Sequence, residues 1–231
     1  MIVKNSSRLS SDERREAIVE AVKGVFAEKG FDGTTTRELA NAAGVSEALL
    51  YKHFPSKESL YAAMLDDCSK KPGFVEFNRI MALEPSISTL VILLHFLFSH
   101  FVQGDSENPH RGVMNRLMVR SLLEDGELVR LAHEKFTGAF IRKFEECLKN
   151  AAKTGALREV PVRRDLRGWF AHHIAVGLML HLQPKVPAVR YKATKETLVE
   201  QAVWFALLGA GLKGEAVKRH YNPKALSLLV E

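Results

Sequence analysis

The sequence is poor in the residues that cross-link or stiffen small extracellular proteins. It has two cysteines, Cys68 and Cys147, among 231 residues, which is too few for a disulfide framework or a cysteine-only zinc site. Its 15 glycines and 8 prolines exclude a fibrous or low-complexity chain. Charged residues at 26% and hydrophobic residues at 46% are typical of globular proteins, and the length predicts one large domain or two small ones.

Long hydrophobic runs are also lacking. The longest, residues 90–102, has 13 residues and contains His95, Ser99 and His100, so it predicts a buried helix rather than a membrane span. Charged residues begin within the first few positions and leave no apolar run, which is unlike a signal peptide. We therefore expect a cytoplasmic protein that has no membrane partner.

The net charge of +6 is unevenly distributed. Residues 1–66 carry 9 Lys/Arg against 10 Asp/Glu, whereas residues 67–231 carry 24 against 17. The basic balance of the whole chain is therefore no evidence for a nucleic-acid site in the first segment, and such a site must be argued from local donors.

Helical periodicity dominates the chain. Ser10 with Glu13 and Thr35 with Glu38 have the spacing of capping boxes, and Ser46 is a good N-cap for a short helix that runs through Phe54. Gly30 would close the first helix, and a fourth helix would start at Pro55–Ser56. The apolar stripe of the first helix comprises Ile18, Val22, Val25 and Phe26.

Longer helical segments follow Lys71–Pro72–Gly73, at about 86–103, 111–123, 126–153, 164–183 and 194–212, with a short piece after them. No alternating β-branched run long enough for a sheet is evident. We predict an all-α fold with an N-terminal three-helix module, residues 1–55, and a larger C-terminal helical bundle, residues 56–231. The fourth helix, from residue 56, would link the two.

Three positions between residues 35 and 60 have the spacing of a helix-turn-helix. Ala40 is small where two helices would cross, Gly44 tolerates a turn with positive φ, and Leu50 can anchor the second helix on the first. The alternative is an ordinary helical hairpin within a bundle.

Donors on the outer face favour DNA binding. The short helix at 46–54 has small or short side chains at its N-terminal end, which would let this end enter a major groove. Tyr51 and Lys52 are natural phosphate donors, although Tyr51 could equally be a tyrosine at the edge of the core. Lys57 lies in the first turn of a helix, where the dipole disfavours a cation unless a phosphate is bound nearby.

This stretch resembles the DNA-binding region of the TetR/AcrR family of bacterial transcriptional regulators. The resemblance covers about residues 8–65. It is carried by Phe26-Ala27-Glu28-Lys29-Gly30-Phe31, Thr34-Thr35, Leu39-Ala40, Ala43-Gly44-Val45-Ser46, Leu50-Tyr51, His53-Phe54, Ser56-Lys57-Glu58 and Leu60.

The resemblance implies that the third helix is the recognition helix. It implies phosphate contacts from Thr35, Thr36, Ser46, Tyr51, His53 and Lys57, and base readout by Glu47, Ala48 and Leu49 with help from Arg37. Glu47 could accept from cytosine N4 or simply face solvent, and Leu49 could meet a thymine methyl group or pack on the preceding helix.

The sequence offers no persuasive catalytic or metal-binding spacing. The histidines of the larger region do not form an i, i+4 pair, so a structural or pocket-lining role is favoured over a metal site. We therefore predict a protein that is not an enzyme and that has neither a cofactor nor a metal.

Residues of the larger region give candidates for a ligand pocket and a dimer interface. The pocket candidates combine aromatic bulk with a few polar rings: Phe96, His100, Met118, Leu122, Phe140, Trp169, Phe170 and His173. The interface candidates lie in the last two long helices, whose small residues permit close helix approach: Ala175, Val176, Gly177, Met179, Ala202, Phe205, Ala206 and Gly209. A solid core and packing within one chain are the alternatives.

The predicted function is that of a homodimeric repressor that binds a palindromic double-stranded DNA operator and is released by a small, apolar effector. One alternative is a constitutive DNA-binding protein without an effector. A second is a helical enzyme or interaction module that does not bind DNA.

Overall fold

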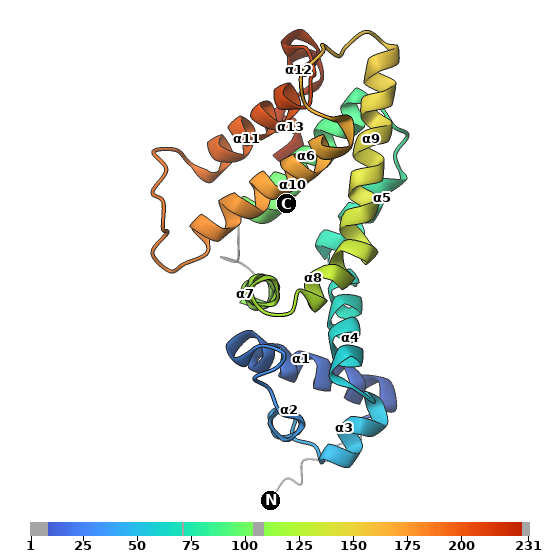
Figure 1. Cartoon of the computed structure of the whole chain (residues 1–231), viewed down its shortest axis with the longest axis vertical. Coiled ribbons are helices and arrows are strands. Elements are labelled where there is room, and N and C mark those ends of the chain that lie inside the picture. The colour runs from blue at the N-terminus through green and yellow to red at the C-terminus, as the bar shows by residue number, and fades with distance from the viewer. Residues whose placement is uncertain (1–8, 71, 104–108, 228–231) are drawn as a thin grey trace, which may run out of the picture. The chain divides into compact units, whose positions relative to one another are not determined.

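The computed structural model describes residues 9–70, 72–103 and 109–227, and its regular elements there are helices (Figure 1). In chain order they are α1 (Ser11–Lys29), α2 (Thr36–Ala42), α3 (Glu47–His53), α4 (Lys57–Ser69), α5 (Pro72–Ala82), α6 (Ile87–Val102), α7 (Pro109–Leu123), α8 (Glu127–Ala132), the π-helical turn η1 (His133–Thr137), α9 (Gly138–Lys153), α10 (Arg164–Leu182), α11 (Lys195–Gly209), α12 (Gly214–His220) and α13 (Pro223–Ser227). The predicted all-α fold is confirmed. No helix in the described ranges is long and apolar enough to cross a membrane.

Two compact units divide the chain. The first contains residues 1–71 and 110–132, and the second contains residues 72–109 and 133–231. Contacts therefore place α4 and α8 with the helix-turn-helix elements. The division into functional domains at residues 55 and 56 stays a prediction, because contacts report packing and not function.

The core of the first unit is built where α1 packs against α2 and α4. Phe26 and Tyr61 meet edge to face, with ring centroids 4.9 Å apart, and both are fully buried. On α1 the buried stripe includes Val19 in place of the predicted Val25. It also includes Lys23, whose ammonium lies 2.7 Å from carboxylate oxygens of both Glu20 and Asp67. A buried cation at this position is tolerated because two carboxylates compensate it.

The second unit is organised around α6, which packs against α5, α9, α10 and α11. Its sequence is apolar almost all round, as expected for a helix enclosed by others, and eleven of its residues are buried. Gly168 allows α10 to approach α9, because a Cβ at this position would lie 3.1 Å from Ile141 and 3.2 Å from Phe144.

Two elements differ from the sequence-based prediction. The boundary at Lys71–Pro72–Gly73 lies between α4, which ends at Ser69, and α5, which begins at Pro72, but α5 itself was not among the predicted segments. Proline is favoured at the first helical position because its missing N–H would be unpaired there in any case. The segment 126–153 predicts a single helix, but η1 interrupts it between α8 and α9. A Cβ on Gly138, directly after η1, would lie 3.2 Å from the His133 carbonyl oxygen, so glycine suits this wide turn.

Candidate nucleic-acid interface

Side chains cap the two short helices of the N-terminal unit at their starts. The Thr35 hydroxyl accepts from the Glu38 backbone N–H at 3.3 Å, and the Glu38 carboxylate accepts from the Thr35 backbone N–H at 2.9 Å. The Ser46 hydroxyl accepts from the Leu49 N–H at 3.2 Å. The capping box at Thr35 and the N-cap at Ser46 are thus confirmed, and they fix where α2 and α3 begin.

The turn between α2 and α3 depends on Gly44, whose φ is +63°. The Val45 N–H donates to the Ala40 carbonyl at 3.0 Å and closes the turn. Leu50 is buried on the inner face of α3, and α2 and α3 pack on each other. The spacing of Ala40, Gly44 and Leu50 therefore produces the helix-turn-helix that it predicted.

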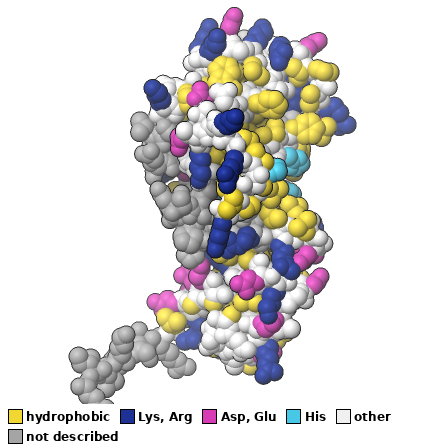
Figure 2. All heavy atoms as spheres, turned by 90° about the vertical axis from the view of Figure 1, so that its left-hand side faces the viewer, with side chains coloured by type: hydrophobic (Ala, Val, Ile, Leu, Met, Phe, Trp, Pro, Cys, Tyr) yellow, Lys and Arg dark blue, Asp and Glu magenta, His cyan; other side chains and the backbone are white. Residues whose placement is uncertain are grey.

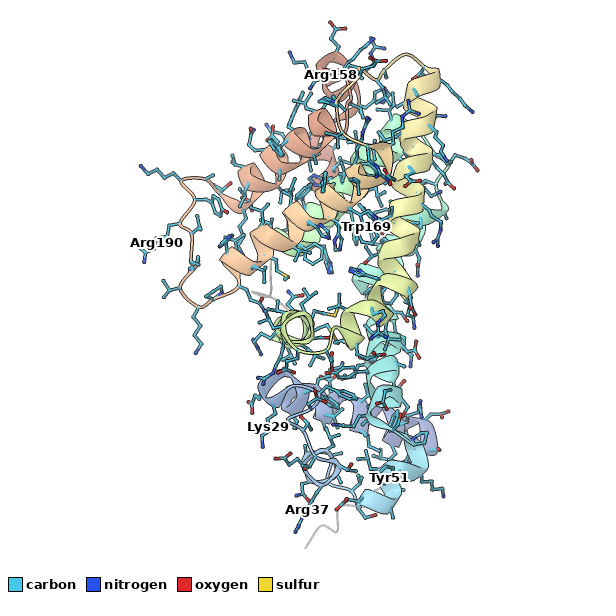
Figure 3. All side chains as sticks on the ribbon, in the orientation of Figure 1. Lys29, Arg37, Tyr51, Arg158, Trp169 and Arg190 are labelled. Atoms are coloured by element: carbon cyan, nitrogen blue, oxygen red, sulfur yellow. The ribbon has the colours of Figure 1, made fainter. Side chains whose placement is uncertain are left out.

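The N-terminal end of α3 is open to solvent. Ser46, Glu47 and Ala48 are exposed, as is Lys52 further along, while Leu49 is half-buried. Arg37 on α2 is exposed as well, and Figure 3 shows the labelled Arg37 and Tyr51 close to the α2 and α3 end of this unit. The predicted base-reading residues thus share one accessible region, although their contacts with bases stay a prediction.

Tyr51 joins the two helices rather than filling the core. Its hydroxyl lies 3.1 Å from the Thr36 hydroxyl, within hydrogen-bond distance, and its ring is half exposed. The structure therefore brings together two of the residues predicted to contact phosphates, with their hydroxyls on one surface.

Thr35 is less available than its neighbours. Its hydroxyl also donates to the Glu38 carboxylate at 2.9 Å, and Lys29 forms an ion pair with the same carboxylate. The hydrogen bonds from Lys29 and Thr35 lower the pKa of Glu38 to about 2. A phosphate at Thr35 would therefore have to compete with a charged carboxylate.

Lys57 also has partners within the protein. Its ammonium donates to the Phe31 carbonyl at 2.6 Å and the Thr34 carbonyl at 3.1 Å, and it lies 4.4 Å from the centre of the Phe31 ring. These contacts give Lys57 a reason to sit in the first turn of α4 without a phosphate. Its contact with a DNA phosphate stays a prediction.

Arg15 on α1 is a positioning residue that the sequence analysis did not identify. Its guanidinium donates to the His53 carbonyl at 2.5 Å and lies 4.1 Å from the centre of the Phe54 ring. It thereby holds the C-terminal end of α3, where His53 is half-buried. The sequence showed only a charged face on α1, and no local pattern indicates a partner 38 residues away.

An apolar pocket of about 110 Å³ lies in the second unit. Its lining comprises Gly73, Phe74, Phe77, Phe96, Leu97, His100, Phe101, Phe136, Thr137, Phe140 and His172. Three of the predicted pocket residues are therefore brought together here.

The other five pocket candidates are not among these lining residues. Trp169 and His173 lie beside the pocket, with ring centroids 6.5 Å and 5.7 Å from His172. Phe170 is exposed. Met118 and Leu122 belong to the first unit, where Leu122 is exposed.

His172 lines this pocket. It was not among the eight named pocket candidates, although the sequence favoured a structural or pocket-lining role for the histidines of the larger region. Burial, followed by the nearby charges of His133 and His173, lowers the pKa of His172 to about 4. Among the described side chains, the Nδ1 atoms of His133 and His172 are buried without a hydrogen-bond partner. His172 is thus neutral at pH 7 and presents an unpaired ring nitrogen in the pocket wall, a feature that the sequence did not reveal.

The predicted dimer residues fall into two groups. Ala175, Met179, Ala202 and Ala206 are buried within the chain itself. Val176 and Gly177 are half-buried, whereas Phe205 and Gly209 are exposed. Figure 2 views the side on which α10 and α11 lie in Figure 1 and shows hydrophobic side chains gathered on this face.

Comparison with known proteins identifies the N-terminal region. Residues 18–64 match the family model for bacterial regulatory proteins of the tetR family. The transcriptional activator FasR of Mycolicibacterium smegmatis is 42% identical over 62 residues, which are 27% of this chain and 28% of FasR. The chain therefore spans less than a third of the length of this relative.

Solved structures extend the likeness to the whole fold. NalD of Pseudomonas aeruginosa, a secondary repressor of a multidrug efflux pump, has a TM-score of 0.62 at 23% identity over 89% of this chain and 100% of its own. AibR, solved with isovaleryl coenzyme A and operator DNA, has a TM-score of 0.59 at 18% identity over 84% of this chain and 97% of its own. The N-terminal region, residues 18–64, therefore belongs to the tetR family of bacterial regulatory proteins, and the chain as a whole shares the fold of these solved regulators.

Proposed function

We propose that the protein is a homodimeric transcriptional repressor whose operator binding is released by a small apolar ligand. The observation that carries the DNA-binding part is the solvent-exposed N-terminal end of α3, with Ser46, Glu47 and Ala48 on it. This end is held in place by the Ser46 cap at its start and by Arg15 at the other end of the helix. A short helix supported in this way can enter a major groove without reorganising, which favours specific binding.

The exposed apolar face of α10 and α11 supports the homodimer. Phe170, Leu180 and Phe205 are large apolar side chains with 49%, 41% and 68% of their surface exposed. Close to them Gly177 and Gly209 have open space around their Cβ positions. Such a face is typical of an interface between helices of two subunits. Two recognition helices about 34 Å apart would then read successive major grooves of a palindromic site.

The aromatic pocket in the second unit supports a ligand-responsive function. A cavity of about 110 Å³ is of the size that holds one aromatic ring, and His172, whose lowered pKa leaves it neutral at pH 7, suits an uncharged molecule. AibR provides a precedent for a protein of this fold bound to a small molecule and to DNA. A ligand would release the operator only by binding one conformational state more tightly than the other, by several kcal/mol.

Repression is the simpler regulatory outcome, because occupancy of an operator suffices for it. FasR, with which the N-terminal region is 42% identical over 62 residues, is an activator, so this likeness does not itself support repression. Transcription from a promoter that carries the selected operator, with and without the protein, tests repression directly.

A selected-DNA binding assay on the purified protein tests the DNA-binding part. We expect enrichment of a palindrome with half-sites one helical turn apart. Glu47→Ala should change the preferred bases. Lys52→Ala should lower the affinity for all DNA sequences alike, because phosphate contacts carry no sequence information. Absence of enrichment, or enrichment of a single asymmetric site, would refute a dimeric operator-binding protein.

A variant that fills the pocket tests the ligand part. Leu97 is buried and lines the pocket, so Leu97→Trp should occupy the cavity. We expect this variant to bind the selected operator like the wild type but to retain it in the presence of single-ring aromatic compounds that release the wild type. If no such compound releases the wild type, the assignment of a single-ring aromatic effector to this pocket is wrong, and a constitutive DNA-binding protein is favoured.

A further inference from the structure

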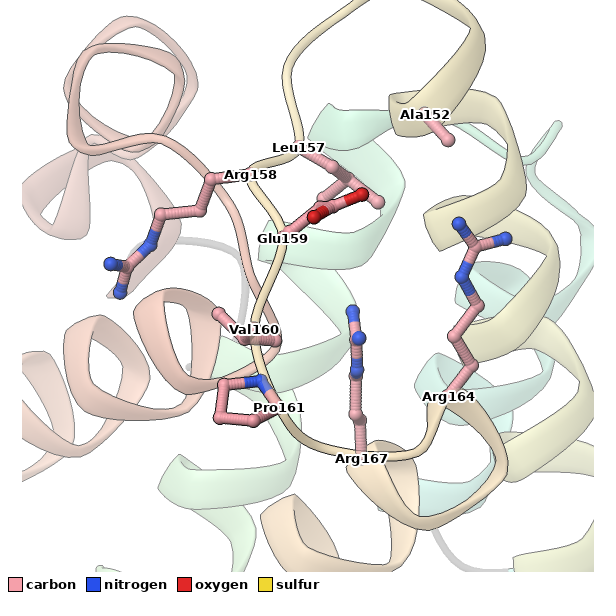
Figure 4. A pocket seen from close by; sticks show the side chains of 8 residues that line it. All are labelled: Ala152, Leu157, Arg158, Glu159, Val160, Pro161, Arg164 and Arg167. Atoms are coloured by element: carbon pink, nitrogen blue, oxygen red, sulfur yellow. The ribbon is translucent and has the colours of Figure 1, made fainter.

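A second and chemically different pocket lies at the other end of α9 from the aromatic rings. It has a volume of about 620 Å³ and is lined by Ala152, Leu157, Arg158, Glu159, Val160, Pro161, Arg164 and Arg167 (Figure 4). We call it the arginine pocket. It shares no lining residue with the aromatic pocket, and no part of the proposed function uses it.

Arg167 is the fixed element of this pocket. Its side chain is on α10, and only 8% of the residue is exposed. Its Nε and Nη2 donate to the Val162 carbonyl at 3.0 Å and 2.8 Å, and its Nη1 donates to the Ala210 carbonyl at 2.8 Å. A guanidinium has five N–H groups, so one N–H on each of Nη1 and Nη2 is left without a partner from these three bonds.

The charge of Arg167 is not neutralised within the described part of the chain. All three hydrogen bonds of its guanidinium go to two backbone carbonyls, those of Val162 and Ala210, and no described carboxylate lies within 4.0 Å of it. Burial, and then the like charge of Arg164, lower the pKa of Arg167. A buried cation without an anion is costly, and an anion in the pocket would remove this cost.

The backbone keeps this arrangement rigid. The Arg158 N–H donates to the Gly211 carbonyl at 2.8 Å, and the Lys213 N–H donates to the Ala156 carbonyl at 2.9 Å. Gly211 has a φ of +100°, and a Cβ there would lie 3.0 Å from the Arg158 carbonyl oxygen and 3.2 Å from the Arg167 Nη1 atom. Because glycine has no Cβ, this turn can lie close to Arg158 and still leave room for the buried guanidinium of Arg167.

The remaining charged side chains of the pocket have different orientations. Figure 4 shows the side chains of Arg164, Arg167 and Glu159 directed toward the same space, whereas that of Arg158 points away. The Nη2 of Arg158 donates to the Leu208 carbonyl at 3.3 Å. Arg164 is exposed and forms no hydrogen bond or ion pair in the described structure. Two guanidinium groups and one carboxylate therefore face the pocket.

We propose that the arginine pocket binds the phosphate groups of a small phosphorylated molecule. Planar guanidinium forks match phosphate oxygens in pairs, and Arg167 offers two such N–H groups already in position. The three carbonyl bonds alone would give Arg167 a purely structural role, tying the start of α10 to the end of α11. That role explains neither the second, unpartnered guanidinium of Arg164 nor a pocket much larger than one ion.

Isothermal titration calorimetry of the full-length protein with pyrophosphate, in a phosphate-free buffer, tests this site. We expect saturable binding, and Arg164→Ala should weaken it about ten-fold, which corresponds to the removal of one charge-assisted hydrogen bond. Glu159→Gln should strengthen pyrophosphate binding, because this substitution removes the one negative charge among the residues that line the pocket. Neither variant alters a buried residue, so both should fold like the wild type.

Arg163→Ala is the matched control. Arg163 neighbours Arg164 in the chain but does not line the pocket and pairs with Asp165 at 2.6 Å. Its removal changes the net charge equally and should leave pyrophosphate affinity unchanged. Absence of saturable binding by the wild type, or equal weakening in Arg163→Ala and Arg164→Ala, would overturn the proposal. Malonate that binds as tightly as pyrophosphate would overturn the assignment to phosphate.

Discussion

At the scale of single residues, the position of α3 depends on contacts made from α1. Arg15→Ala removes the hydrogen bond to the His53 carbonyl and the contact with the Phe54 ring. We expect a decrease of about 1–2 kcal/mol in the free energy of unfolding together with weaker operator binding, measured by urea denaturation and by DNA titration.

Arg14→Ala is the control for this change, because Arg14 carries the same charge one residue away. It should have little effect on either measurement. Equal effects of the two substitutions would mean that the charge of the α1 surface matters and not the support of α3.

Glu38 should titrate far below an ordinary glutamate. Its pKa is lowered to about 2 by hydrogen bonds from Lys29 and Thr35. Since its folded-state pKa is depressed, its contribution to stability is fully present above the ordinary value of 4.5 and disappears as the pH falls toward 2. A carboxyl-carbon NMR titration measures this pKa directly. Lys29→Met should raise it, and an unchanged value would contradict the assigned cause.

What the sequence revealed at this scale was the local chemistry. The caps at Ser10, Thr35 and Ser46 were predictable because each joins residues three positions apart. The partners of Arg15 and Lys57 were not, since they lie 38 and 26 residues away in the chain. Long-range partners of a charged side chain leave no periodic pattern in a sequence.

At the scale of elements, two exposed glycines should respond in opposite ways to the same substitution. Gly24 lies inside α1 and Gly44 in the turn after α2 with a φ of +63°, and both have open space around the Cβ position. Gly24→Ala should stabilise the protein by up to about 1 kcal/mol through helix propensity. Gly44→Ala should destabilise it by about 1 kcal/mol, because alanine disfavours this backbone conformation. Thermal unfolding of both variants measures the contrast, and shifts of the same sign would contradict it.

The elements that sequence patterns missed have physical explanations. Pro72 does mark a boundary between helices, but it is also the first residue of α5, a helix that the sequence analysis did not include. The π-helical turn at His133–Thr137 needs one extra residue per turn, and a single sequence gives no periodic signal over five residues. The aromatic pocket was only partly predicted for a related reason: α5 and η1 supply Phe74, Phe77 and Phe136.

At the scale of the whole molecule, the exposed apolar face of α10 and α11 predicts self-association. Phe205→Glu places a charge at its most exposed aromatic residue and should convert a dimer into a monomer, as measured by light scattering after size exclusion. Leu123→Glu is the matched control, because Leu123 on α7 is 82% exposed and lies outside this face. A dimer that survives Phe205→Glu would place the interface elsewhere.

The ammonium of Lys57, which is bonded to the carbonyls of Phe31 and Thr34, has a consequence for how operator affinity depends on ionic strength. These carbonyls are uncharged, so the ammonium keeps its charge and can still neutralise a DNA phosphate. Lys57→Met should therefore lower stability and make the slope of log affinity against log salt concentration shallower by about 0.9, the value expected for one neutralised phosphate. An unchanged slope would instead show that Lys57 only holds the Phe31 and Thr34 carbonyls and does not contact the DNA backbone.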